Sequence, residues 1–375
     1  TKSGASALAS QSQAGDCWAA SDTPEATLAC EIEKRGEGIV FLVVAGIGWI
    51  AGLVLALRAT GWRVDVWSLG GTWPHPDAVA LAAAEEKVAS LADGTLVVAD
   101  GLAFGALQAL AAQHAERLRW VALVHHPLHL ETGLSEAARQ HLLASETRAL
   151  RHARHVVVPS RVTASDVANM GVPPERIAVV EPGTDPVAVA SRPRPEGPLR
   201  LLCVATLTAR KGHNLLLQAL AGLMQLDWEL HNVGSATRDP DTAARLFALA
   251  APLGDRVVWH GEMDAKALQA HYAVADVFVL ASLHEGFGMV ITEALAHGLP
   301  VVASDGGALA QTLPADAGLQ VPAGEVAPLQ AALARVLTDA ALRERLRAGA
   351  RAAAGRLATW PQQAARFAAV LEGVE

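Results

Sequence analysis

The chain has 375 residues, a net charge of −8, and 51% hydrophobic but only 4% aromatic residues. This length allows two domains that each bury a core, and the composition favours helices packed on sheets over a β-sandwich. The acidic balance argues against the basic surface that nucleic-acid binding needs, so an anionic substrate would require a local positive site.

The cysteines indicate the redox compartment. Cys17, Cys30 and Cys203 are odd in number and lack the spacing of a metal or redox motif. Unpaired thiols of this kind are typical of reduced proteins, so we expect a cytoplasmic protein.

Residues 1–37 are small and polar, and then charged from Glu31 onwards. They contain no apolar core of the kind that a signal peptide has, and we expect a leader without an assigned role.

Residues 39–57 carry no charge over nineteen positions, which is long enough for a transmembrane candidate. Glycines at 46, 48 and 52 divide the stretch into a short β-branched run and a helical run. We therefore expect a buried strand, a tight turn and a helix, with a membrane span as the alternative.

The turn at Gly46 and Gly48 also resembles the start of a dinucleotide-binding unit. In such a unit an acidic residue stands at the end of the second strand and binds a ribose. Asp65 is expected to lie inside that strand instead, which weakens this interpretation without removing it.

The following residues alternate between strand and helix patterns. Strands are expected over 61–67, 95–99, 120–124 and 155–159, and helices over 76–91, 103–115 and 135–153. His125 and His126 follow the 120–124 strand. Because α/β proteins bind ligands at the carboxyl ends of parallel strands, one of these imidazoles should point into a crevice. The alternative is that both are polar loop residues before a proline.

Residues 191–198 include three prolines and no apolar pattern, which predicts a linker. A second α/β series follows it. Its strands are expected over 201–205, 228–233, 257–262, 276–280 and 300–303, and its helices from about 214, 241, 266, 289, 329, 342 and 360.

The pattern is most informative around the 276–280 strand. Gly286 and Gly288 lie between this strand and the next helix, so free amides of the first helical turn can bind an anion. Glu285 and Glu293 frame that turn, and carboxylates suit hydroxyls better than phosphates. The pattern therefore predicts a site for a sugar joined to a nucleoside diphosphate. The alternative is that Glu293 and His297 form a solvated helix pair and Glu285 is a turn residue.

The stretch from Glu285 through Gly-Phe-Gly-Met to Glu293, with the later Gly-Leu-Pro-Val-Val-Ala, resembles the signature of retaining glycosyltransferases of family four. The resemblance implies an α/β fold with two Rossmann-like domains facing a cleft, the GT-B fold. It implies a leader over 1–37, an acceptor-side domain over 38–190, a linker over 191–198, a nucleotide-sugar domain over 199–356, and a helix over 357–375 that crosses back to the first domain.

The resemblance also implies roles. In the family an arginine and then a lysine before glycine neutralise the donor diphosphate. Lys211 matches the lysine, but Thr206 stands where the arginine is expected. Arg210 is a weak substitute, because its neighbour Lys211 would then point elsewhere.

The other implied roles concern the sugar and the ribose. The resemblance implies that His125, or else His126, reaches a sugar hydroxyl near the reacting carbon. Glu285 would hold sugar hydroxyls and Glu293 the ribose. The backbone of the Gly46–Gly48 turn would approach the donor diphosphate or the acceptor. The remaining binding residues lie in the other glycine turn and at the start of the helix that follows it: Gly286, Phe287, Gly288 and Met289.

The sequence thus predicts a retaining glycosyltransferase that moves a hexose-type sugar from a nucleoside diphosphate sugar, with UDP or GDP as the nucleotide, to an acceptor hydroxyl. His125, Lys211 and Glu285 are the predicted catalytic residues, and no cofactor or metal is expected. Nucleic acid is not an expected partner, and membrane association is not favoured. Two alternatives stay open: an NAD-dependent oxidoreductase that uses Gly46 and Gly48, and a non-catalytic sugar-nucleotide binder, which Thr206 suggests.

Overall fold

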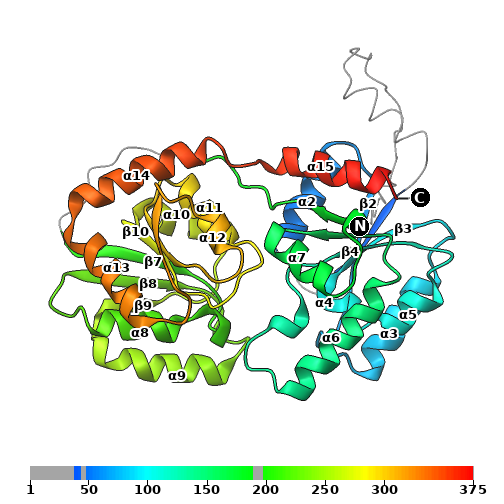
Figure 1. Ribbon diagram of the computed structural model, residues 1–375, viewed down its shortest axis with the longest axis horizontal. Coiled ribbons are helices and arrows are strands. Elements are labelled where there is room, and N and C mark those ends of the chain that lie inside the picture. The colour runs from blue at the N-terminus through cyan, green and yellow to red at the C-terminus, as the bar shows by residue number, and fades with distance from the viewer. Residues whose placement is uncertain (1–37, 44–47, 189–196, 375) are drawn as a thin grey trace, which may run out of the picture.

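The computed structural model describes residues 38–43, 48–188 and 197–374, and Figure 1 shows two α/β lobes side by side. Each lobe contains a six-stranded sheet in which every recorded strand pair is parallel. The predicted architecture of two Rossmann-like domains is therefore confirmed.

The first sheet has the strand order β2-β1-β3-β4-β5-β6. Its strands are β1 (Ile39–Val43), β2 (Val64–Ser68), β3 (Leu96–Asp100), β4 (Arg119–Leu123), β5 (His155–Val158) and β6 (Ile177–Val179). Its helices are α2 (Gly48–Ala59), α3 (Ala78–Ala89), α4 (Gly101–Phe104), α5 (Gln108–Gln113), α6 (Glu136–Leu150) and α7 (Arg161–Asn169).

Helices cover both faces of this sheet. Successive side chains of a strand point to opposite faces, so alternate residues pack against the helices on opposite sides. Trp120 and Ala122 of β4 belong to the core cluster under α3 and α5, whereas Val121 and Leu123 belong to the cluster under α2. All four side chains are fully buried. A parallel strand that is buried on both faces needs such a continuous apolar run, which is why the strand was recognisable in the sequence.

The second sheet has the order β12-β11-β10-β7-β8-β9. Its strands are β7 (Leu199–Val204), β8 (Trp228–Val233), β9 (Val257–Trp259), β10 (Val277–Leu280), β11 (Val301–Ser304) and β12 (Gly318–Val321). Its helices are α8 (His213–Ala221), α9 (Pro240–Ala250), α10 (Ala265–Val274), α11 (Met289–Ala296), α12 (Leu309–Thr312), α13 (Val326–Thr338) and α14 (Ala340–Ala354).

The last helix, α15 (Trp360–Glu372), lies against α2 of the first domain in Figure 1. The Phe41 and Phe367 rings are 6.1 Å apart, and Gly52 leaves the space that the Trp360 ring occupies. The α15 helix therefore packs on the first domain. It brings the end of the chain into the first domain's core.

The uncharged stretch over residues 39–57 forms β1 and the start of α2, with residues 44–47 outside the described part of the chain. Among the described residues no helix is both long and apolar enough to cross a membrane. The stretch is apolar because Phe41, Leu53 and Leu57 are buried in the core between sheet and helix.

Three details differ from the expectations. The helix expected over 103–115 is divided into α4 and α5, because Gly105 caps α4 and packs closely against Leu128. The strands β6 and β12 were not predicted. Each has only three or four residues and lies at a sheet edge with partly exposed side chains, so its apolar pattern is weak.

The last strand of the first sheet ends at Val179, and the first strand of the second sheet begins at Leu199. Residues before the undescribed segment 189–196 run beside the start of α15, where the Thr184 N–H donates to the Ala358 carbonyl. The domain limits drawn from the sequence stay predictions, and the leader over 1–37 lies outside the described residues.

Candidate functional site

The loops that follow the strands of the two sheets meet between the domains. The carbonyl of His125, after β4, approaches Gly286, after β10, so closely that a Cβ on Gly286 would lie 2.0 Å from that oxygen. The Thr163 hydroxyl of α7 also donates to the Gly286 carbonyl, at 3.3 Å. Gly286 was expected to allow the close approach of a ligand. In this structure it allows the approach of the other domain.

Glu285 is at the centre of the site and is only 8% exposed. Its Oε1 accepts hydrogen bonds from Lys211 Nζ at 2.6 Å and from the Ser282 hydroxyl at 2.7 Å. Its Oε2 lies 3.2 Å from Arg210 Nη1. Burial would raise the pKa of Glu285, but the charges of Lys211 and Arg210 outweigh it and lower the pKa to about 2. The carboxylate is therefore ionised at neutral pH.

The structure corrects the interpretation of Arg210. We expected Arg210 and Lys211 to point apart, but both side chains reach the Glu285 carboxylate. The two residues lie in a short 3-10 turn (Ala209–Lys211), from which two long side chains converge. Thr206 lies four residues earlier, just after β7, where the resemblance placed an arginine. Arg210 thus supplies a second cation in the loop where Thr206 lacks one.

The backbone after these two cations requires a glycine, which is Gly212. Its φ of +66° is a left-handed conformation that favours glycine, and a Cβ would lie 2.0 Å from the Ala281 carbonyl oxygen. The turn after β7 therefore packs directly on the end of β10. This contact places Lys211 beside Glu285.

Arg210 also connects the two domains. Its Nε lies 3.1 Å from Glu131 Oε1 of the first domain, and His126 Nε2 lies 3.4 Å from the other Glu131 oxygen. Burial opposes ionisation of Glu131, but the His126 hydrogen bond and the Arg210 charge lower its pKa to about 2. Glu285 and Glu131 thus balance the charges of Lys211 and Arg210, and Glu131 does so from the first domain.

His125 is held by first-domain residues. Its Nε2 lies 3.5 Å from Asp100 Oδ1, and its ring packs edge-on against Trp49 with centroids 5.1 Å apart. Asp100 ends β3, is 1% exposed, and also accepts the Leu102 N–H at the start of α4. The neighbouring strands β3 and β4 thus place a carboxylate beside the imidazole.

Glu285, Lys211, Arg210 and Glu131 form the Glu285 cluster. Glu293 lies apart from it. It lines a cavity of about 130 Å³ with Thr184, Tyr272 and Trp360, among others. The Tyr272 hydroxyl donates to Glu293 Oε2 at 2.8 Å, and burial raises the pKa of Glu293. The alternative of a solvated pair with His297 does not hold, because His297 Nδ1 contacts the Glu293 backbone carbonyl rather than its carboxylate.

The remaining predicted residues surround the start of α11. Gly288 has a φ of +93° and precedes the helix, and the Phe287 carbonyl accepts a hydrogen bond from Thr312. Met289 lines the Glu293 cavity, and its Cε lies near Gly48 at the start of α2. Gly46 lies outside the described residues. Asp65 lies inside β2 as expected, and not at its end, where a ribose-binding acid belongs.

Sequence reasoning missed Asp100 and Glu131. Asp100 could have been found, since it is an acidic residue at the end of a buried strand and next to the strand that precedes His125. Glu131 could not, because its partner Arg210 is 79 residues away in the other domain.

Residues 187–353 match the family model of glycosyl transferases group 1, and residues 86–187 match that of Glycosyltransferase Family 4.

Two curated relatives and one solved structure are similar to the chain. A D-inositol 3-phosphate glycosyltransferase of Xylanimonas cellulosilytica is 31% identical over 66% of this chain and 65% of its own length. An MMP alpha-(1->4)-mannosyltransferase of Mycolicibacterium hassiacum is 31% identical over 67% and 64%. The chain thus spans slightly less than two thirds of either relative. The structure of a sucrose-phosphate synthase from Thermosynechococcus elongatus aligns with a TM-score of 0.75 at 25% identity, over 90% of this chain and 98% of that one.

Proposed function

The chain belongs to the group 1 glycosyltransferases of GT-B type, and we propose that it transfers a hexose-type sugar from a nucleoside diphosphate sugar to an acceptor hydroxyl. We further propose that the anomeric configuration is retained and that the nucleotide is UDP or GDP. Relatives named as glycosyltransferase and mannosyltransferase support sugar transfer.

The observation that carries the proposal is the 2.6 Å contact between Lys211 and Glu285. In a nucleotide sugar the reacting carbon is bonded directly to a phosphate oxygen. Groups that recognise the phosphate and groups that recognise the sugar hydroxyls must therefore be neighbours. Lys211 and Glu285 are a cation and an ionised carboxylate in that arrangement, in the loops that follow the adjacent strands β7 and β10.

Lys211 and Arg210 would stabilise the departing diphosphate. Their charges are balanced by Glu285 and Glu131, so a bound diphosphate would compete with these carboxylates for the two cations. Negative charge grows on the phosphate as the glycosidic bond breaks. A fixed donor aimed at such charge contributes about 2.7–4 kcal/mol to the transition state.

His125, which belongs to the first domain, would contact a sugar hydroxyl. Asp100 would fix the orientation of the His125 ring. In the proposed reaction the acceptor oxygen bonds to the sugar carbon while the bond from that carbon to the phosphate oxygen breaks. The acceptor proton passes to the leaving phosphate on the same face. The products are the glycoside and a nucleoside diphosphate, so atoms and charge balance without a further reactant.

Ligand binding tests this proposal. Thermal unfolding is followed with UDP, GDP, ADP, dTDP and NAD, and release of the nucleoside diphosphate from the matching sugar nucleotide is then measured with and without candidate acceptors. We expect one nucleoside diphosphate to raise the unfolding temperature, and its sugar to be transferred. Binding of NAD alone would support the oxidoreductase, and binding without transfer or hydrolysis would support a non-catalytic binder.

A further inference from the structure

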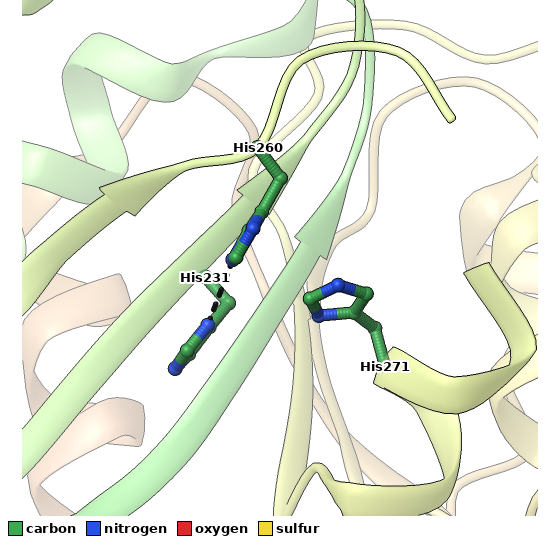
Figure 2. Close-up of side chains that lie close together, drawn as sticks. All are labelled: His231, His260 and His271. Carbon is green, nitrogen blue, oxygen red and sulfur yellow. Dashed lines mark hydrogen bonds between the residues drawn. The ribbon is translucent and has the colours of Figure 1, made fainter. Parts of the chain in front are cut away.

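Three histidines gather in the second domain, away from the Glu285 cluster. His231 lies on β8, His260 directly after β9, and His271 on α10. Figure 2 shows the His231 and His260 rings side by side above the sheet, with the His271 ring facing them from the helix. One ring nitrogen of each residue lies within 4.8 Å of those of the other two.

The contacts around His231 favour one tautomer. Its Nε2 lies 3.4 Å from Glu229 Oε2, and a carboxylate in that position accepts an N–H. Its Nδ1 then carries a lone pair and accepts a hydrogen bond from His260 Nε2, 2.9 Å away. The Nδ1 lone pair of His231 thus points directly at the His260 imidazole.

Burial and nearby positive charge disfavour the protonated form of the other two imidazoles. Burial and the neighbouring histidines lower the pKa of His260, and burial, His231 and Arg200 lower that of His271. Neutral imidazole nitrogens are the form that binds metals. Glu229 and Arg200 also face the cluster from the sheet, and their 3.9 Å ion pair brings one charge of each sign.

We propose that His231, His260 and His271 bind a late first-row divalent metal ion, of the class of Zn²⁺. Zinc–imidazole bonds of about 2.0–2.1 Å in tetrahedral geometry place the ligand nitrogens about 3.4 Å apart. The His231 and His260 nitrogens must therefore separate by roughly half an ångström, and the His271 ring must turn inward. The proton on His260 Nε2 moves to Nδ1, and a water completes the coordination.

The ligand set decides between classes of metal. Imidazoles suit zinc, copper and nickel, whereas magnesium and calcium require oxygen ligands. The Glu229 carboxylate contacts the outer nitrogen of His231 and would orient it rather than bind the ion. The sequence predicted no metal site, because the ligands lie 29 and 11 residues apart without a recognisable motif.

A bound ion would fix α10 to β8 and to the loop after β9. His271 is followed on α10 by Tyr272, which donates to Glu293. The ion would therefore lie beside one wall of the Glu293 cavity and would not touch that cavity or the Lys211–Glu285 pair. The site is independent of the proposed transfer reaction, and its test does not depend on activity.

Metal binding to the full chain without a polyhistidine tag provides the test. The protein is stripped with chelator, and Zn²⁺ binding is measured by competition with a chromophoric chelator, with Mg²⁺ in excess. We expect one Zn²⁺ per chain in the parent protein. His260→Gln and His271→Ala should each weaken binding by about tenfold or more. The matched control is His141→Ala, which removes an exposed histidine of α6.

A second measurement on the parent protein keeps the proposal testable if a variant fails to fold. X-ray absorption of the bound Zn²⁺ should give three imidazole ligands, and bound Co²⁺ should show the visible bands of a four-coordinate site. The proposal is overturned if the parent binds no Zn²⁺, if folded His260→Gln and His271→Ala bind it as well as His141→Ala does, or if the bound ion has fewer than two imidazole ligands.

Discussion

Arg210 of the second domain and Glu131 of the first form an ion pair between the domains, with Arg210 Nε 3.1 Å from Glu131 Oε1. Glu131 holds the guanidinium through this ion pair, so a donor diphosphate must compete with the Glu131 carboxylate.

Glu131→Gln should therefore tighten binding of the preferred nucleoside diphosphate. Because the pair is partly exposed, the gain should be modest, about 0.5–1 kcal/mol or a few-fold in Kd. Isothermal titration calorimetry measures this, with the exposed Glu136→Gln on α6 as the control. Weaker binding in Glu131→Gln would mean that the ion pair assists donor binding by closing the cleft.

Glu146 should make stability depend on pH. It is 1% exposed, its Oε2 accepts the Leu128 N–H at 2.9 Å, and burial raises its pKa from 4.5 to about 8. A raised carboxyl pKa means that the fold favours the neutral form. Its stabilising contribution is therefore complete below pH 4.5 and is lost as the pH rises through 8.

The Glu146→Gln variant should lack this pH-dependent contribution to the free energy of unfolding. The free energy of unfolding of the parent relative to the variant should decline between pH 4.5 and 8, by at most about 1.4 kcal/mol per pH unit. Urea unfolding at several pH values measures it, with the exposed Glu116→Gln as the control. Parallel pH profiles for the parent and Glu146→Gln would refute the assignment.

Glu293→Ala should weaken nucleotide binding and leave the fold intact. The carboxylate lines a cavity, and its one recorded side-chain partner among the described residues is Tyr272. Loss of a charged hydrogen bond to a ribose should cost about 1–3 kcal/mol. Tyr272→Phe removes the internal contact alone and is the matched control. If Glu293→Ala binds every nucleoside diphosphate as the parent does, the ribose role is wrong.

Chelation should leave the rate of sugar transfer unchanged. Lys211 and Arg210 already supply two positive charges at the proposed diphosphate position, so no ion is needed there. Initial rates with and without EDTA test this, and manganese is then added back. Lost turnover that manganese restores would indicate metal-assisted departure of the phosphate instead.

The sequence predicted those features that depend on local patterns. Strands such as β4 and β10 are continuous apolar runs because both of their faces are buried, so their positions could be read directly. Glu285 and Lys211 were found through their glycine-containing turns and the family resemblance.

Contacts between distant residues could not be predicted in this way. The convergence of Arg210 and Lys211 on one carboxylate depends on how the turn after β7 packs on Ala281. The pair of Glu131 with Arg210 depends on how the two domains meet. The histidine cluster forms only when β8, β9 and α10 lie together. In each case the partners have no periodic relationship in the sequence.

The central claim is that the Lys211–Glu285 pair is where the donor's sugar and diphosphate meet. The most direct measurement compares kcat and donor Kd for the parent, Lys211→Ala and the control Lys266→Ala, which removes an exposed lysine of α10. Because charge on the leaving diphosphate grows in the transition state, Lys211→Ala should lower kcat by about 10²–10³-fold and weaken donor binding much less. Unchanged kcat and Kd in Lys211→Ala would contradict the account, since the diphosphate would then lie elsewhere.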